Sequence, residues 1–170
     1  MKNWIKWNKM ILAGILLVGM AGLLVIQLVA WSREHHNPPV VQEPNWASPE
    51  TRMLTQRACF DCHSNETDWP WYSKVAFMST MVEQDVENGR EVLNFSEWGI
   101  GDQEGADMER IVEVITKGQM PPPYYLMLHP EARLTDAETA QLINGLIATT
   151  SGSADNLESN QLDESKTDDN

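Results

Sequence analysis

Cys59 and Cys62, the two cysteines of this chain, are separated by two residues, and His63 follows directly. A Cys-x-x-Cys pair can serve as a dithiol redox switch, as half of a zinc site, or as the attachment point of a haem. Haem attachment also uses the next residue, because two thiols add to the two vinyl groups of one porphyrin and the adjacent histidine reaches the iron. The spacing therefore favours a covalently bound haem, with Cys59 and Cys62 as thioether sites and His63 as the proximal iron ligand.

The alternatives to haem fit the rest of the sequence less well. A dithiol switch needs no histidine and would more naturally lie in a βαβ context, and no alternating strand pattern of useful length is present. Zinc would need four ligands, and beyond the motif only His129 is available where a second pair is usual. A structural disulfide remains possible in an exported chain.

The segment "KGQMPPPYYLMLHP" supplies candidates for the sixth iron position. Met120 follows a glycine that ends a predicted helix and precedes three prolines, which restrict the backbone and suit presentation of a thioether to a metal. We therefore expect Met120 to be the distal ligand, with His129 as the less favoured alternative. Met127 lies between two leucines, and we expect it in the core.

Arginines and aromatic residues could complete a haem pocket. Arg57, Arg90 and Arg133 could each pair with a propionate, and the sequence does not rank them. The large rings could wall the pocket or belong to an ordinary core; they are Trp69, Trp71, Tyr72, Phe95 and Trp98.

The apolar run from Met10 to Trp31 has Gln27 as its only strongly polar residue. About 20 apolar residues span the hydrocarbon core of a bilayer. Three lysines lie before the run, so the positive-inside rule keeps residues 1–9 in the cytoplasm and exports the remainder. A cleaved signal peptide is the competing interpretation, but its apolar region is usually only about 7 to 15 residues long. We expect an uncleaved transmembrane anchor over residues 10–31.

The exported part divides into three segments by composition. Residues 32–47 contain three prolines and no helical periodicity, and we expect a tether. Residues 48–150 carry the motifs and form the expected haem-binding, cytochrome c-like domain. Residues 151–170 have no aromatic residue and few large apolar residues, so we expect a disordered acidic tail.

Helix signals recur throughout the domain. Ser48 and Pro49 can start a helix that carries the cysteine motif at its end. Further helices are expected over 75–88, stopped by Gly89, and over about 108–115, stopped by Gly118. Thr135 and Glu138 form a capping box before the last helix. The predicted fold is all-α, with long loops around one haem and a single transmembrane helix before it.

The chain carries 25 acidic and 12 basic residues, a formal net charge of −13. Nucleic-acid binding needs clustered lysine and arginine, so nucleic acid is not an expected partner. An acidic surface could meet a basic partner, but a solvated acidic face is the commoner explanation.

Three ordered blocks carry a family resemblance: "CFDCHSNETDWPWYSKVA", "ENGREVLNFSEW" and "KGQMPPPYYLMLHPEARLTDAE". Over residues 45–147 the sequence resembles the haem-binding domain family, small c-type-cytochrome-like domains usually tethered by one N-terminal membrane helix. The resemblance implies one haem c, with Cys59 and Cys62 as thioether sites and His63 as the proximal ligand. Similarity to cytochromes c in general implies Met120 as the distal ligand.

These features predict a membrane-anchored mono-haem cytochrome that carries single electrons on the periplasmic, or outer, face of the inner membrane. The expected partners are redox proteins such as other cytochromes, a quinol-oxidising complex or a terminal oxidase. No acid–base pair or nucleophile constellation stands near the motifs, so no enzyme is indicated. The alternative is a haem-based sensor or a peroxidase-like unit with an open sixth iron site.

Overall fold

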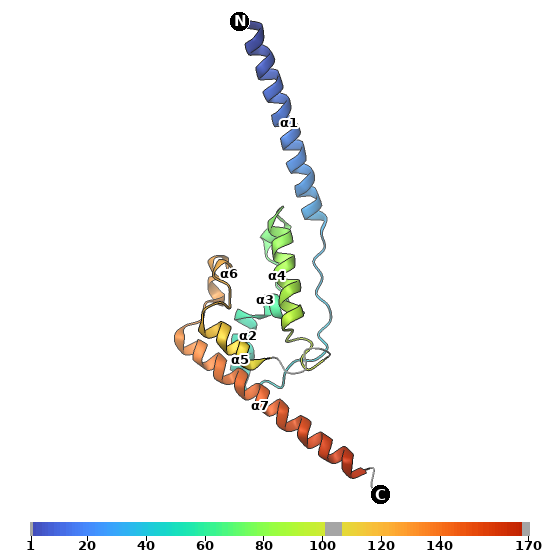
Figure 1. The fold of residues 1–170 in the computed structure, drawn as a ribbon, viewed down its shortest axis with the longest axis vertical. Coiled ribbons are helices and arrows are strands. Elements are labelled where there is room, and N and C mark those ends of the chain that lie inside the picture. The colour runs from blue at the N-terminus through green and yellow to red at the C-terminus, as the bar shows by residue number, and fades with distance from the viewer. Residues whose placement is uncertain (1, 101–106, 168–170) are drawn as a thin grey trace. The chain divides into compact units, whose positions relative to one another are not determined.

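Helices form the regular secondary structure of the chain (Figure 1). The computed structural model describes residues 2–100 and 107–167, with side chains for 7–100 and 107–152. Within these ranges no strand occurs, and a single isolated bridge joins Gln42 to Glu97. The prediction of an all-α fold is confirmed. In chain order the elements are α1 (Lys2–Ser32), α2 (Pro49–Ala58), α3 (Phe60–His63), η1 (Trp71–Lys74), α4 (Met78–Val92), α5 (Met108–Thr116), α6 (Pro123–Leu128), η3 (Pro130–Ala132) and α7 (Asp136–Thr167).

The chain divides into two compact units. The N-terminal unit contains residues 1–36 and 69–85, and the main unit contains residues 37–68 and 86–170. In the N-terminal unit, α1 contacts η1. Among the described residues, α1 is the helix that is long and apolar enough to cross a membrane: within Trp7–Ser32, an 18-residue window has a mean hydropathy of 2.5, and none of that window is buried.

The helices of the main unit begin and end where local chemistry predicts. The N–H of Thr51 donates to the Ser48 hydroxyl at 3.1 Å, which caps α2. The capping box also forms, because the N–H of Thr135 donates to the Glu138 carboxylate and the N–H of Glu138 donates back to the Thr135 hydroxyl. Gly118 has a φ of +64° just beyond α5, which is the left-handed conformation that ends many helices.

Two glycines allow helices to come into close contact. At one of them the predicted helix end is wrong. α4 does not stop at Gly89 but continues to Val92. A Cβ at Gly89 would lie 2.4 Å from the carbonyl oxygen of Cys62, so this glycine lets the backbone of α4 approach the motif. A Cβ at Gly145 in α7 would lie 2.1 Å from the Thr51 hydroxyl oxygen, so α2 and α7 meet there equally closely.

The core of the main unit is aromatic and aliphatic. Phe95 stacks between Phe60 and Trp98, with ring centroids 5.8 and 5.7 Å apart, and Trp46 lies 5.5 Å from Phe95. Burial of each such side chain contributes about 1.5–3 kcal/mol. The fully buried members of the cluster are Leu54, Phe60, Phe95, Leu142 and Leu146.

Residues 37–47 belong to the main unit, although the sequence predicts a tether from residue 32 to 47. The N–H groups of Val41 and Gln42 donate to the carbonyl of Ser96 at 2.9 and 3.0 Å, and the N–H of Trp98 donates to the carbonyl of Gln42. Extended, proline-rich backbone has free hydrogen-bonding groups, and here the 96–98 segment satisfies them. Lack of helical periodicity therefore marks an extended segment here, not an unattached one.

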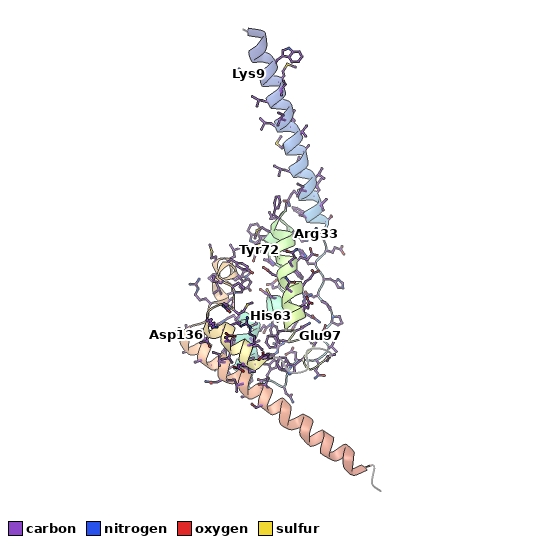
Figure 2. All side chains as sticks on the ribbon, in the orientation of Figure 1. Lys9, Arg33, His63, Tyr72, Glu97 and Asp136 are labelled. Carbon is purple, nitrogen blue, oxygen red and sulfur yellow. The ribbon has the colours of Figure 1, made fainter. Side chains whose placement is uncertain are left out.

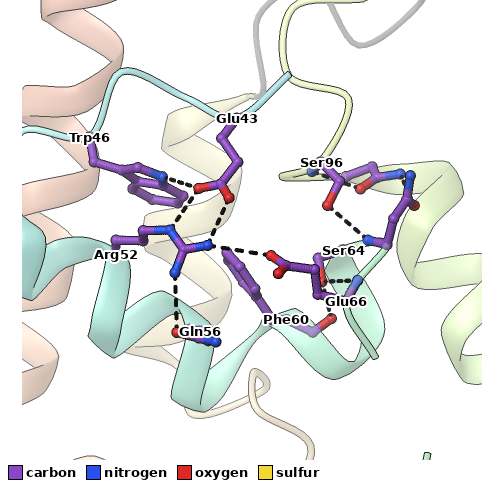
Figure 3. A network of polar contacts seen from close by, with 10 residues as sticks. Glu43, Trp46, Arg52, Gln56, Phe60, Ser64, Glu66 and Ser96 are labelled. Carbon is purple, nitrogen blue, oxygen red and sulfur yellow. Dashed lines mark hydrogen bonds and ion pairs between the residues drawn. The ribbon is translucent and has the colours of Figure 1, made fainter. Parts of the chain in front are cut away.

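A polar network fastens the same segment to α2 (Figure 3). The Arg52 guanidinium donates to both carboxylate oxygens of Glu43, at 2.7 and 2.8 Å, and also approaches Glu66. The indole N–H of Trp46 donates to the same Glu43 carboxylate at 2.7 Å. The hydrogen bonds from Arg52 hold the pKa of Glu43 below its ordinary value.

α7 extends to Thr167, through most of the segment in which the sequence predicts a disordered tail. Residues 151–167 contain no proline, so nothing in the covalent structure interrupts the helical hydrogen bonds. Residues 168–170 of the expected tail, and part of the expected 1–9 segment, lie outside the described residues.

Candidate functional site

The Cys-x-x-Cys-His motif lies at the junction between α2 and α3. Cys59 follows the last residue of α2 and precedes α3, and His63 is the last residue of α3 (Figure 2). The N–H groups of Cys62 and His63 both donate to the carbonyl of Cys59, at 3.2 and 2.9 Å. This single turn places Cys59 and His63 on one face, since residues four apart are neighbours on a helix.

The imidazole of His63 is fixed by the C-terminal end of α4. Its Nδ1 lies 2.9 Å from the carbonyl oxygen of Gly89 and 3.1 Å from that of Leu93. Both oxygens are acceptors only, so Nδ1 carries the proton and the lone pair is on Nε2. Burial lowers the pKa of His63, although the two carbonyls act in the opposite direction. The ring is therefore neutral at neutral pH, the form that binds metals.

A cavity of about 240 Å³ lies beside this ring. His63 and Cys59 line it together with Met120. The rest of its wall is largely apolar, including Val92, Leu93, Phe95, Ile111, Val114 and Ile115. The structure thus brings three of the predicted site residues to one cavity. Cys62 is in the same helical turn but not on this wall.

Met120 also lines a second cavity of about 160 Å³, again with Cys59 and Ile115. The N–H of Met120 donates to the carbonyl of Val114 at 3.2 Å, so the backbone folds back onto the last turn of α5. Its side chain remains partly exposed. Both this backbone bond and the prolines that follow therefore position the thioether.

His129 lies elsewhere in the main unit and lines neither of these cavities. Its ring stacks on Tyr125 with centroids 4.2 Å apart, and its Nδ1 lies 3.0 Å from a carboxylate oxygen of Glu131. Met127 is 79% exposed, so its expected place in the core is wrong. Its side chain is on the solvent side of the short helix α6.

The Cys59 thiol lies in a low-dielectric environment. The structure has no disulfide between Cys59 and Cys62. Burial raises the pKa of Cys59 to about 12, with a smaller contribution from Cys62. Reactive dithiols work through a thiolate, and their environments lower this pKa. The surroundings of Cys59 are thus unlike those of a dithiol redox site.

A family model for a haem-binding domain matches residues 21–148 of the chain. This match spans most of the sequence, including the motif and Met120. The chain belongs to the haem-binding domain family. No curated protein and no solved structure matches it.

The residues around the larger cavity fit a haem-binding domain. Apolar walls suit a flat apolar macrocycle, and a neutral histidine with its Nε2 lone pair available suits iron. The propionate carboxylates of a haem would need a cation nearby. Arg110 lines this cavity, and Arg133 lines the smaller one, so either could supply it. Of the other predicted arginines, Arg57 pairs with a glutamate of α7, and Arg90 donates to the carbonyl of Ser64.

Sequence reasoning missed the residues that support the motif from other elements. The carbonyls of Gly89 and Leu93 orient the histidine, and backbone groups leave no signature in side-chain types. The hydroxyl of Tyr125 donates to Asp61, inside the motif, at 2.6 Å. A tyrosine 64 residues away along the chain has no pattern that would reveal this partner, although Asp61 in the motif is a visible polar acceptor.

Proposed function

We propose that this haem-binding protein is a membrane-anchored mono-haem c-type cytochrome that carries single electrons. In this proposal Cys59 and Cys62 form the thioether bonds, His63 is the proximal ligand and Met120 the distal one. The observation that carries it is the cavity bounded by Cys59, His63 and Met120, with the His63 ring held by two carbonyls. A bound haem would supply a one-electron iron couple.

The protein's own groups suit such a carrier. Carbonyl oxygens at Nδ1 make a histidine more basic and fix its orientation, as the outer partners of metal-bound histidines commonly do. Apolar walls keep water from the centre, and a methionine ligand raises the potential of a haem. The carboxylate that lines the cavity, Asp107, already accepts from the N–H of Arg110 as the cap of α5. The site therefore favours electron transfer over acid–base catalysis, and we propose no enzymatic activity.

The membrane topology and the partners belong to the same proposal. α1 would cross the inner membrane with Lys2, Lys6 and Lys9 on the cytoplasmic side, which exports the main unit to the periplasmic or outer face. There it could exchange electrons with other cytochromes, a quinol-oxidising complex or a terminal oxidase. Attachment to the membrane keeps the carrier in the plane where such complexes lie.

The test is the absorption spectrum of the full chain, made with haem-attachment machinery and recorded oxidised, reduced, and reduced with CO. We expect a low-spin c-type spectrum with a far-red sulfur-to-iron band that Met120→Ala abolishes. Met127→Ala is the matched control, because that methionine is 79% exposed and should leave the band intact.

Other spectra would overturn parts of the proposal. A wild-type protein that is high-spin and binds CO freely has an open sixth site, which is the property of a sensor or peroxidase-like unit. Loss of the low-spin spectrum in His129→Ala but not in Met120→Ala would make His129 the ligand. A colourless protein would refute covalent haem attachment.

A further inference from the structure

Gln27, the polar residue inside the apolar run of α1, is bonded to another segment of the N-terminal unit. Its amide Nε2 donates to the carbonyl of Lys74 at 2.9 Å, and its Oε1 accepts from the N–H of Ala76 at 3.2 Å. A side-chain amide in hydrocarbon is costly unless both of its ends find partners. The backbone of residues 71–77, which we call the aromatic loop, provides both.

The aromatic loop lies against one face of the last turns of α1. Among the described side chains of α1, Ala30 is buried and Gln27 is partly buried, whereas the others are exposed. These two residues are three apart and so share a helix face. Immediately after α1, His35 Nε2 lies 3.0 Å from the carbonyl of Ser73. Arg33 pairs with Glu83 at 2.8 Å, which fastens the start of α4 to the same end of α1.

These contacts set the level of the aromatic loop along the helix axis. Gln27 precedes the end of α1 at Ser32 by five residues, which is about 7.5 Å at the α-helical rise. Amphipathic segments that lie on a membrane bury their apolar face roughly 5–10 Å into the boundary between headgroups and acyl chains. If α1 spans a bilayer, the aromatic loop is therefore at the depth of that boundary.

The side chains of the aromatic loop suit this environment. Trp71 is 80% exposed and Phe77 is 77% exposed, and Tyr72 packs edge-on against Trp71 with centroids 5.8 Å apart. Phe77 also has a φ of +69°, a left-handed conformation that is rare for a bulky residue and has to be held by its surroundings. Tryptophan concentrates at membrane–water interfaces, and the exposed Lys74 suits anionic headgroups.

We infer that the aromatic loop is a second membrane contact, which inserts into the headgroup and acyl boundary beside the C-terminal end of α1. The occupant of the exposed aromatic surface is the lipid bilayer itself. This inference rests on the proposed function in one respect, namely that α1 spans the membrane. A second contact would fix the height and the rotation of the N-terminal unit at the membrane, which a single helix followed by a free tether would not do.

The test uses the full chain in nanodiscs of phosphatidylcholine and phosphatidylglycerol. A photo-crosslinking benzoylphenylalanine replaces Phe77 or Trp71 by amber suppression, and lipid adducts are measured by mass spectrometry after irradiation. The control position is Gln84, which is exposed on α4 in the same unit but seven residues beyond Phe77. All three side chains face solvent in the structure, so the replacements remove no buried contact.

We expect at least about tenfold more lipid adduct from positions 71 and 77 than from position 84, because interfacial groups contact headgroups and acyl chains directly. Equal, low yields at the three positions would overturn the inference. Adducts to a protein, and not to lipid, when the same variants are irradiated in native membranes would overturn the assignment of lipid as the occupant.

A separate measurement distinguishes failure of this inference from failure of the proposed function. Extraction of the wild-type protein with alkaline carbonate reports whether α1 is an integral span, independently of the loop. Retention of the protein together with low lipid adducts refutes only the loop contact. Release of the protein refutes the anchor and the loop contact together, while the haem spectrum still decides the role of the main unit.

Discussion

Replacement of Gly89 by alanine distinguishes the structure from simple helix propensity. Alanine is favoured over glycine inside a helix by about 1 kcal/mol, so propensity alone predicts a more stable protein. The structure predicts the opposite, because the new Cβ would lie 2.4 Å from the carbonyl oxygen of Cys62 and 3.0 Å from its Cβ. Much of this contact is backbone, so α4 has to move away from α3.

The magnitude follows from three contributions. Overpacking costs about 1–3 kcal/mol. Loss of the hydrogen bond from His63 to the carbonyl of Gly89 costs about 0.5–1.5 kcal/mol. The gain in helix propensity offsets about 1 kcal/mol of this. We expect Gly89→Ala to lower the free energy of unfolding by about 0.5–3.5 kcal/mol.

The assay is urea unfolding of the full chain in detergent, followed by far-UV circular dichroism, together with the potential of the bound haem. Loss of a carbonyl at Nδ1 makes the ligand less basic, which destabilises the oxidised state and raises the potential. Gly145→Ala is a control that clashes with Thr51 and should lower stability without moving the potential. Gly152→Ala, inside α7 and with nothing within 4 Å of the new Cβ apart from its own helix backbone and neighbours, should gain up to about 1 kcal/mol of helix propensity and leave the potential unchanged. A Gly89→Ala protein as stable as Gly152→Ala, with the wild-type potential, would refute the reasoning.

Two further substitutions test the supports of the motif and of α7. Tyr125→Phe removes the hydroxyl that donates to Asp61 at 2.6 Å, and we expect a loss of about 1–3 kcal/mol in urea unfolding because a charged acceptor loses its donor. The N–H of Thr135, followed by Arg57, lowers the pKa of Glu138 to about 2 from 4.5. A lowered folded-state pKa contributes stability above the unfolded value that is lost as pH falls through the folded value. Glu138→Gln should therefore flatten the fall in thermal midpoint between about pH 4.5 and pH 2, and an unchanged slope would contradict this.

Local signals in the sequence were enough to predict several elements. The caps at Ser48 and Thr135 depend on side chains that bond to backbone within three residues, so their partners are visible in the sequence. The apolar run that forms α1 is equally local. The motif with Cys59 and His63 is specific because its chemistry requires fixed spacing over one helical turn. Met120 is predicted as a ligand from its place between a helix end and three prolines; it lines the cavity beside His63, and its bond to iron stays a prediction.

Tertiary contacts explain what the sequence could not predict. Glycine often ends a helix, so the sequence predicts a stop at Gly89, yet Gly89 lies inside α4. A glycine fits there because the backbone at Cys62 lies within contact distance of it. Only the presence of α3 makes a side chain at that position costly. The sequence predicts a tether over residues 32–47 because the backbone partners of Val41 and Gln42, around Ser96, are more than 50 residues away along the chain. Met127 has an apolar sequence context but faces solvent, since α6 is a short helix in which no residue is fully buried.

The C-terminal end of α4 would lower the redox potential of the haem at the proposed iron site. A Met120 ligand would raise this potential. Carbonyls in the last turn of a helix lack intrahelical partners, and the helix dipole makes this end partly negative. The Nδ1–H of His63 satisfies the carbonyl of Leu93, just beyond the last helical residue, Val92. These oxygens raise the basicity of the imidazole and favour the higher charge of oxidised iron, whereas a thioether ligand favours the reduced state. The potential therefore depends on where α4 ends as well as on which residue is the sixth ligand.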